Sequence, residues 1–143
     1  MRGEIYRLQN NIILIDDSYN SNPAALEAAL KDLSELEAKR KVAVLGDMLE
    51  LGEAQAPYHA KAGKQVQQNG WNLLITVGPL GHHMAEGALQ AGMNNGQISS
   101  FESSEEAANH VPSLLEPGDL VLVKGSRGIK TEKIVERLKK KGN

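Results

Sequence analysis

The sequence contains no cysteine and few aromatic residues, and each shortage excludes a class of function. Without cysteine, the 143-residue chain has no disulfide framework, thiolate nucleophile or cysteine-ligated zinc. Aromatic residues are 3% of the chain, fewer than a base-stacking surface for nucleic acid needs. No apolar run approaches the roughly 20 residues of a membrane span, and no signal-peptide pattern is present. We therefore expect a cytoplasmic protein that binds neither nucleic acid nor membrane.

Two glycine-rich nucleotide motifs are also missing. The pattern GxxxxGK[ST] does not occur, so the chain lacks the usual phosphate cradle for ATP hydrolysis. The absence of GxGxxG weighs against a classical dinucleotide fold. Lysine and arginine are absent between Gln65 and Val123, whereas 8 of the 16 lie between Lys124 and Lys141. The last lysines are typical of a solvated helix end, where cations suit the helix dipole.

Short apolar runs alternate with segments of helical spacing along the chain. The spacing predicts helices at 23–37, 57–68, 80–90, 104–115 and 130–140. Buried strands are expected at 11–16, 41–47, 72–78 and 119–125, with a shorter strand at 97–101. Residues 5–8 pair with the first of these as a hairpin or precede it as a separate strand. The alternation predicts one α/β domain, Rossmann-like and three-layered, with a mostly parallel sheet and helices on both faces.

Polar residues that follow the first buried strand form a candidate ligand site, because ligands bind at the carboxyl ends of parallel strands. Asn22 suits a helix N-cap, and Pro23 suits the first helical position. The adjacent carboxylates of Asp16 and Asp17 exceed what a turn requires. Carboxylates in this place bind ribose hydroxyls or a metal ion, so we expect Asp17 to contact a ligand.

A second candidate site is the segment Lys124-Gly125-Ser126-Arg127-Gly128, which joins the last strand to the last helix. Its glycines allow a close backbone approach, and the following helix presents free N–H groups. Lys124 supplies positive charge, and Arg127 can hold a carboxylate with two hydrogen bonds. The segment therefore predicts an anion site.

The histidines do not predict a metal site. His82 and His83 are adjacent, so they point to different sides of a helix and make a poor ligand pair. His59 lies early in a predicted helix and is interpreted as structural.

Two other classes of function remain open from the residues alone. Paired aspartates, Asp47 and Lys124 at strand ends also match a receiver domain, in which the acids hold Mg²⁺ and one accepts phosphate. The 30 residues from Asp17 to Asp47 span one helix, however, and a receiver needs a further βα unit. The third interpretation is an inert α/β module that binds a nucleotide or a protein.

Four motifs occur in order along nearly the whole chain: IDDSYNSNP, VLGDMLELG with His59 after it, TVG, and VLVKGSRG. Together they resemble the C-terminal domain of the Mur ligases. The DSYNxNP and GDMLELG forms are similar to those of the branch that adds D-alanyl-D-alanine. The resemblance implies that residues 1–143 are the third domain of a three-domain enzyme, without its UDP-binding and central ATP-binding domains. Residues 1–4 look like the junction with the central domain.

The same resemblance implies an activity for the complete enzyme. It would join D-alanyl-D-alanine to UDP-N-acetylmuramoyl-tripeptide through an acyl phosphate, using ATP, in peptidoglycan precursor synthesis. The central domain would hold most of the Mg²⁺ ligands. This chain would contribute to ATP and dipeptide binding and would be inactive alone, and we expect it to be a monomer.

Residue by residue, the resemblance gives one group of side chains a nucleotide role. Arg2 would reach the ATP phosphates, and Asp17 would bind the ribose. Tyr19 and Asn22 would lie beside the nucleotide. Ser21 stands where many relatives have alanine.

A second group of side chains would face the incoming substrate and the reaction centre. Lys124 would be catalytic, and Ser126 and Arg127 would bind the substrate carboxylate. Three further residues match motif positions without a role that follows from their chemistry: Asp47, Glu50 and His59.

Overall fold

The centre of the molecule is a six-stranded sheet in the order β1-β2-β6-β3-β4-β5. The computed structural model describes residues 3–19 and 21–142. Strand β1 pairs antiparallel with β2, and the other neighbours are parallel, as predicted. The first two strands form the hairpin alternative. The strands are β1 (Glu4–Arg7), β2 (Ile13–Asp17), β3 (Arg40–Gly46), β4 (Leu73–Val77), β5 (Ile98–Phe101) and β6 (Asp119–Lys124).

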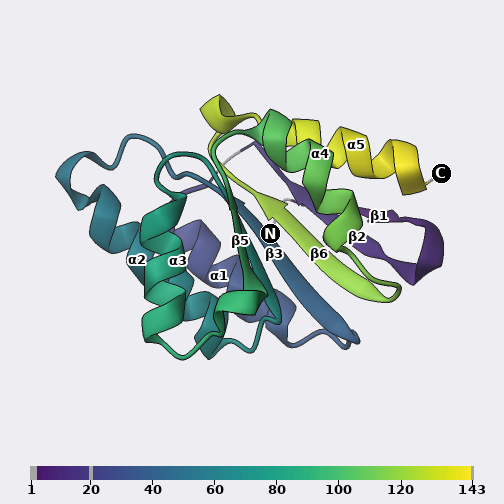
Figure 1. The fold of residues 1–143 in the computed structure, drawn as a ribbon, viewed down its shortest axis with the longest axis horizontal. Coiled ribbons are helices and arrows are strands. Elements are labelled where there is room, and N and C mark those ends of the chain that lie inside the picture. Colours follow the sequence, from purple (N-terminus) through teal and green to yellow (C-terminus); the bar gives the residue numbers. More distant parts are fainter. Residues whose placement is uncertain (1–2, 20, 143) are drawn as a thin grey trace.

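In the described residues, five α-helices cover the two faces of the sheet, which makes the predicted three layers (Figure 1). One face carries α1 (Pro23–Ser34), α2 (Gln55–Gln68) and α3 (Gly81–Gln90). The other carries α4 (Ser104–Leu114) and α5 (Glu132–Gly142). Four 3₁₀ turns are η1 (Gln9–Asn11), η2 (Gly52–Ala54), η3 (Asn95–Gln97) and η4 (Arg127–Ile129). In the part of the chain that is described, no helix combines the length and apolarity of a membrane span.

Local chemistry explains where the helices begin. The Asn22 side-chain oxygen accepts a hydrogen bond from the Ala25 N–H (2.9 Å) and caps α1 as predicted. Helix α2 starts before Pro57 rather than at it, because proline is tolerated in the first helical turn. The predicted start of α5 at Lys130 was wrong: that residue has left-handed backbone angles (φ 62°), so the helix begins at Glu132.

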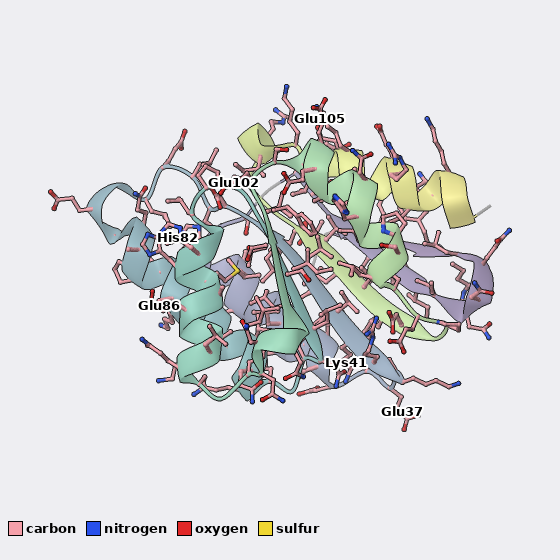
Figure 2. The ribbon with its side chains drawn as sticks, in the orientation of Figure 1. Glu37, Lys41, His82, Glu86, Glu102 and Glu105 are labelled. Carbon is pink, nitrogen blue, oxygen red and sulfur yellow. The ribbon has the colours of Figure 1, made fainter. Side chains whose placement is uncertain are left out.

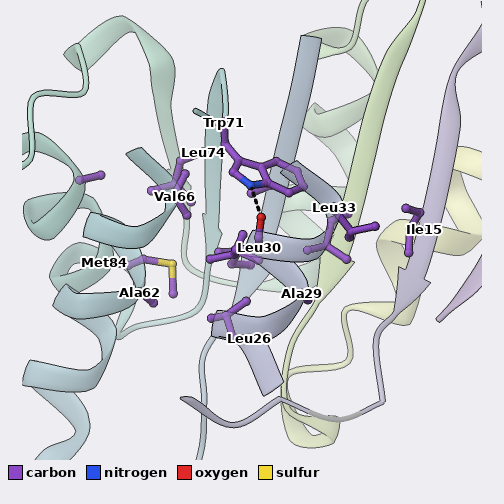
Figure 3. Packing of buried hydrophobic residues seen from close by; sticks show 14 of the residues in the cluster. Ile15, Leu26, Ala29, Leu30, Leu33, Ala62, Val66, Trp71, Leu74 and Met84 are labelled. Atoms are coloured by element: carbon purple, nitrogen blue, oxygen red, sulfur yellow. Dashed lines mark hydrogen bonds between the residues drawn. The ribbon is translucent and has the colours of Figure 1, made fainter. Parts of the chain in front are cut away.

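Two hydrophobic clusters pack against the two faces of the sheet. On the α1–α3 face, the Trp71 indole N–H donates to the Leu30 carbonyl of α1 (3.0 Å; Figure 3). Helices α2 and α3 meet closely at Gly63 and Gly87, where a Cβ would collide with the backbone of the opposite helix. The other face buries apolar residues of β3, β4 and β6 beneath α4 and α5. The chain thus encloses a core on both sides of the sheet.

The strand order places a topological switch point at the carboxyl ends of the central strands. Strand β6 lies between β2 and β3, although it is the last strand in the sequence. The chain leaves β2 and β3 into helices on one face, whereas it leaves β6 into α5 on the other (Figure 1). Connections that diverge in this way open the edge of a parallel sheet to ligands.

Candidate functional site

The sheet register brings two predicted site residues into contact. Asp17 ends β2 directly opposite Lys124, which ends β6. Both side chains lie on the face of α1 to α3, because each is two residues beyond a residue of that core, Ile15 or Leu122. The Lys124 ammonium group contacts the Asp17 carboxylate at 2.5 Å, and their side chains are 4% and 14% exposed. The predicted catalytic and ribose-binding residues therefore form one ion pair.

The segment after Asp17 retains hydrogen-bonding capacity. The Ser18 and Ser21 side chains are buried, and their hydroxyls have no partner among the described residues. Buried hydroxyls normally find a partner, so these two leave hydrogen-bonding capacity unused. Beside them, Tyr19 is 59% exposed. An ion pair, two unpartnered hydroxyls and an exposed ring suit a polar ligand with a flat group.

Two further residues, Asn22 and Arg2, were predicted to contact the nucleotide. The Asn22 side-chain oxygen is used for the α1 cap, and its contact with a nucleotide stays a prediction. Arg2 lies outside the described residues.

Ser126 joins three loops through its backbone and hydroxyl. Its N–H donates to the Asp47 carbonyl (3.1 Å). Its hydroxyl accepts from the Leu49 N–H (2.9 Å) and donates to the Ser21 carbonyl (3.3 Å). Ser126 therefore holds the site together, and its predicted contact with substrate remains untested.

The rest of the Lys124–Gly128 segment is shaped for close approach. A Cβ on Gly125 would lie 3.1 Å from the Gly46 Cα, so the two strand ends touch through glycine. Arg127 is exposed at the start of η4, beyond the buried Lys124. The segment thus combines a buried cation with an exposed one.

Asp47 is a site residue whose role did not follow from its motif position. It follows β3 and is 2% exposed, and its carboxylate accepts from the Leu80 N–H (3.1 Å). Burial raises the pKa of Asp47; the Leu80 hydrogen bond, His59 and His82 oppose this rise, and Glu102 adds to it. Figure 2 places His82 and Glu102 at this same end of the molecule. The buried carboxyl fixes the turn between β4 and α3.

The ring of His59 is fully buried, and both of its nitrogens have partners. Nε2 accepts from the Met48 N–H (2.9 Å), and Nδ1 donates to the Gln55 carbonyl (2.6 Å). This agrees with the structural interpretation of His59. Glu50 is exposed in the same loop, with a left-handed backbone (φ 65°). Across the described ranges, no three side chains of histidine, cysteine, aspartate or glutamate are grouped to hold a metal ion.

Comparison with solved structures identifies the class of fold. A crystal structure of MurF from Acinetobacter baumannii matches 96% of this chain with a TM-score of 0.83 and 26% identity, over 30% of its own length. The MurF ligase from Thermotoga maritima in complex with ADP matches 96% of this chain with a TM-score of 0.77 and 24% identity, also over 30% of its length. The shared region has the architecture described above.

The sequence comparison narrows this class to a family. Residues 1–127 match the family described as "Mur ligase, glutamate ligase domain". The chain belongs to this family, as its motifs predict, and the receiver-domain interpretation is excluded.

Similar curated proteins carry a more particular name. The UDP-N-acetylmuramoyl-tripeptide–D-alanyl-D-alanine ligase of Bacillus subtilis is 34% identical over 139 residues, which cover 96% of this chain. The ligase of that name from Rickettsia prowazekii is 32% identical over 137 residues, or 94% of this chain. The chain spans about 30% of the length of these relatives.

Proposed function

We propose that the chain is the C-terminal domain of a ligase that adds D-alanyl-D-alanine to UDP-N-acetylmuramoyl-tripeptide in an ATP-dependent reaction of peptidoglycan precursor synthesis. The observation that carries the proposal is its similarity to ligases of this name along 94–96% of the chain. In this proposal, residues 1–143 are one domain of a three-domain enzyme and are inactive alone. We also propose that the enzyme is monomeric and cytoplasmic and that it binds neither nucleic acid nor membrane.

The nucleotide is assigned to the segment that follows β2. The Asp17 carboxylate would accept hydrogen bonds from ribose hydroxyls, since it lies at the carboxyl end of β2 and is partly open to water. The exposed Tyr19 ring offers a flat surface beside it. Arg2 would reach the phosphates, and Asn22 would complete the contact from the start of α1. The ADP complex of the related Thermotoga maritima ligase supports a nucleotide role for this fold.

The dipeptide is assigned to the segment from Lys124 to Gly128. D-alanyl-D-alanine ends in a carboxylate, and Arg127 is an exposed cation that can bind it with two hydrogen bonds. Lys124 is buried at the carboxyl end of β6, where a fixed positive charge would stabilise negative charge that develops in a reaction. Ser126 would add a polar contact from the same loop.

ATP would supply the phosphoryl group that activates the peptide carboxylate for attack by the dipeptide amine. The residues of this chain would orient the nucleotide, hold the dipeptide carboxylate and exclude water as the domain closes. The Mg²⁺ ligands are assigned mainly to the central domain, because the described residues show no group of side chains that would hold a metal ion.

The proposal is tested with the full-length protein that carries this chain. Phosphate release from ATP should require both UDP-N-acetylmuramoyl-tripeptide and D-alanyl-D-alanine, and mass spectrometry should show the joined product. The 143-residue chain alone should give none. Product formation by the isolated chain, or none by the full-length protein, would contradict the proposal.

Two substitutions separate the assigned ligands. Asp17→Ala should raise the KM for ATP roughly tenfold to a hundredfold, because losing a hydrogen bond to a charged group costs about 1.5–3 kcal/mol. Arg127→Ala should instead raise the KM for the dipeptide. A rise in the ATP KM alone for Arg127→Ala would move that residue to the nucleotide.

A further inference from the structure

The loop after β3 and the Lys124–Gly128 segment are joined by contacts that the proposed chemistry does not explain. The Asp47 carbonyl accepts from the Ser126 N–H, and the Leu49 N–H donates to the Ser126 hydroxyl. The Leu49 side chain also lies against Gly128, where a Cβ would come within 2.8 Å of its Cδ1 atom. A displacement of Leu49 would therefore disturb contacts of the segment that carries both candidate cations.

The position of this loop depends in turn on His59. The imidazole accepts from the Met48 N–H, one residue before Leu49, and its other nitrogen donates to the Gln55 carbonyl at the start of α2. These partners require a neutral ring with the proton on Nδ1. The ring is fully buried, so the Met48 N–H would lose its partner without ready access to water if the acceptor were removed.

We propose that His59 is a positioning residue for the dipeptide end of the reaction. It connects α2 to Met48, the adjoining Leu49 contacts Ser126, and Ser126 sets the place of the Lys124–Gly128 segment. This inference rests on the proposed function for its substrate, but the contacts themselves do not. It gives His59 a role that requires no contact with a ligand, since the ring is buried and both of its nitrogens have partners within the protein.

Two substitutions of His59 differ in the atom that matters. A glutamine side chain can place its oxygen near the Nε2 position and accept from the Met48 N–H. An asparagine side chain can place its amide near the Nδ1 position and donate to the Gln55 carbonyl, but it is too short to reach Met48. His59→Gln should therefore rescue the loop, and His59→Asn should not.

The first measurement uses the 143-residue chain, which has a core on both faces of its sheet. In ¹H–¹⁵N NMR spectra, His59→Asn should shift the amides of Leu49, Ser126 and Gly128, and His59→Gln should leave them near their wild-type positions. The control His110→Asn, on α4 at the opposite face, should leave them unmoved.

The second measurement uses the full-length ligase. His59→Asn should raise the dipeptide KM about tenfold or more and change the ATP KM less, because a displacement of about 1 Å in a positioning group can cost on the order of 100-fold. His59→Gln should restore the dipeptide KM. Unmoved Ser126 and Gly128 amides in His59→Asn, or equal effects of the two variants, would overturn the proposal. If the wild-type enzyme does not use the dipeptide as a substrate, the proposed function is wrong. The NMR result still shows whether His59 positions the Lys124–Gly128 segment.

Ser126→Ala tests the other end of the connection, including the case in which His59→Asn does not fold. It removes the acceptor for the Leu49 N–H and should raise the dipeptide KM while the imidazole ¹⁵N shifts of His59 stay unchanged. In a folded double variant with His59→Asn, Ser126→Ala should raise the dipeptide KM little further, because both substitutions break the same connection between His59 and Ser126. Fully additive effects, or an unchanged dipeptide KM in Ser126→Ala, would contradict the inference.

Discussion

The two ends of the sheet each bury an ion pair, but the polar groups around the two pairs differ in how many of them have hydrogen-bond partners. At the amino ends of the strands, Arg40 contacts both oxygens of Asp119 (3.0 and 2.8 Å), Glu116 (3.0 Å) and the Leu114 carbonyl (2.7 Å). The hydrogen bond to Asp119 raises the pKa of Arg40. Figure 2 marks this end by Glu37 and Lys41, and the opposite end by Glu102 and Glu105.

At the carboxyl ends, the pair of Asp17 and Lys124 lies among groups with hydrogen-bonding capacity to spare. The Ser18 and Ser21 hydroxyls have no partner in the described ranges. Arg127 is exposed nearby. Burial of an ion pair therefore does not by itself mark a ligand site. What distinguishes the carboxyl end is polar capacity that the fold leaves unfilled.

The largest expected effect is at the amino end. Arg40→Met leaves the Asp119 carboxylate, only 1% exposed, without its main cation. Removing one partner of a buried pair costs about 3–5 kcal/mol in the free energy of unfolding. Urea denaturation of the 143-residue chain measures the loss, with Lys31→Met, at an exposed site on α1, as the control for charge. Similar losses in both variants would show that the pair does not stabilise this end.

Lys124→Met should affect turnover more than stability, which is the opposite of what we expect for Arg40→Met. Its loss of stability should be smaller than that of Arg40→Met, because Asp17 is 14% exposed and can be hydrated. Turnover of the full-length ligase should fall on the order of 100-fold to 1,000-fold if Lys124 stabilises developing charge. Steady-state kinetics and urea denaturation measure the two effects, with exposed Lys61→Met as control. Undiminished turnover would make this pair as structural as the one at Arg40.

Asn22 tests whether one residue at the carboxyl end has both roles. Asn22→Ala should lower the free energy of unfolding by about 1 kcal/mol, since the α1 cap is lost. Asn22→Ser keeps a cap and should restore stability, but it should not restore the KM for ATP if the side chain also contacts nucleotide. Recovery of both quantities in Asn22→Ser would reduce the residue to a cap.

The smallest expected effect is the pH dependence from Asp47. Because burial raises its pKa, the folded protein keeps the proton where the unfolded chain releases it. Its contribution to stability is complete below the ordinary carboxyl pKa of about 4 and is lost as the pH rises through the folded pKa. The stability of Asp47→Asn relative to wild type should therefore increase over that range in urea denaturation. Exposed Glu53→Gln is the control; a flat difference for Asp47→Asn would contradict the assignment.

The fold was predictable because its signals are local. The Asn22-Pro23 start of α1 and the apolar runs of β3, β4 and β6 follow from neighbouring residues, and the structure confirms them. The start of α5 was not predictable in this way. A left-handed lysine at position 130 depends on the turn that η4 makes after Arg127, and nothing in the side chain of Lys130 favours it.

The sequence allowed us to predict which residues belong to the site, but not which of them contact one another. Strand ends in the sequence singled out Asp17 and Lys124, but their contact requires β6 to pair with β2, a long-range register that apolar patterning does not specify. The contacts of Ser126 were hidden for the same reason, because its partners belong to other loops. The structural role of His59 was predicted, but its bond to the Met48 N–H in the loop after β3 was not. Motif spacing selected these residues without revealing which of them hold others in place.

The central place of β6 also governs when the site can exist during synthesis. Asp17 and Lys124 are separated by 107 positions, so a ribosome has made nearly the whole domain before the two can meet. Until then β2 and β3 each lack a neighbour, and a non-local pairing of this kind is slow to close. The domain cannot offer its ligand site in an incomplete form, because the strand that closes the sheet is the strand that delivers the lysine.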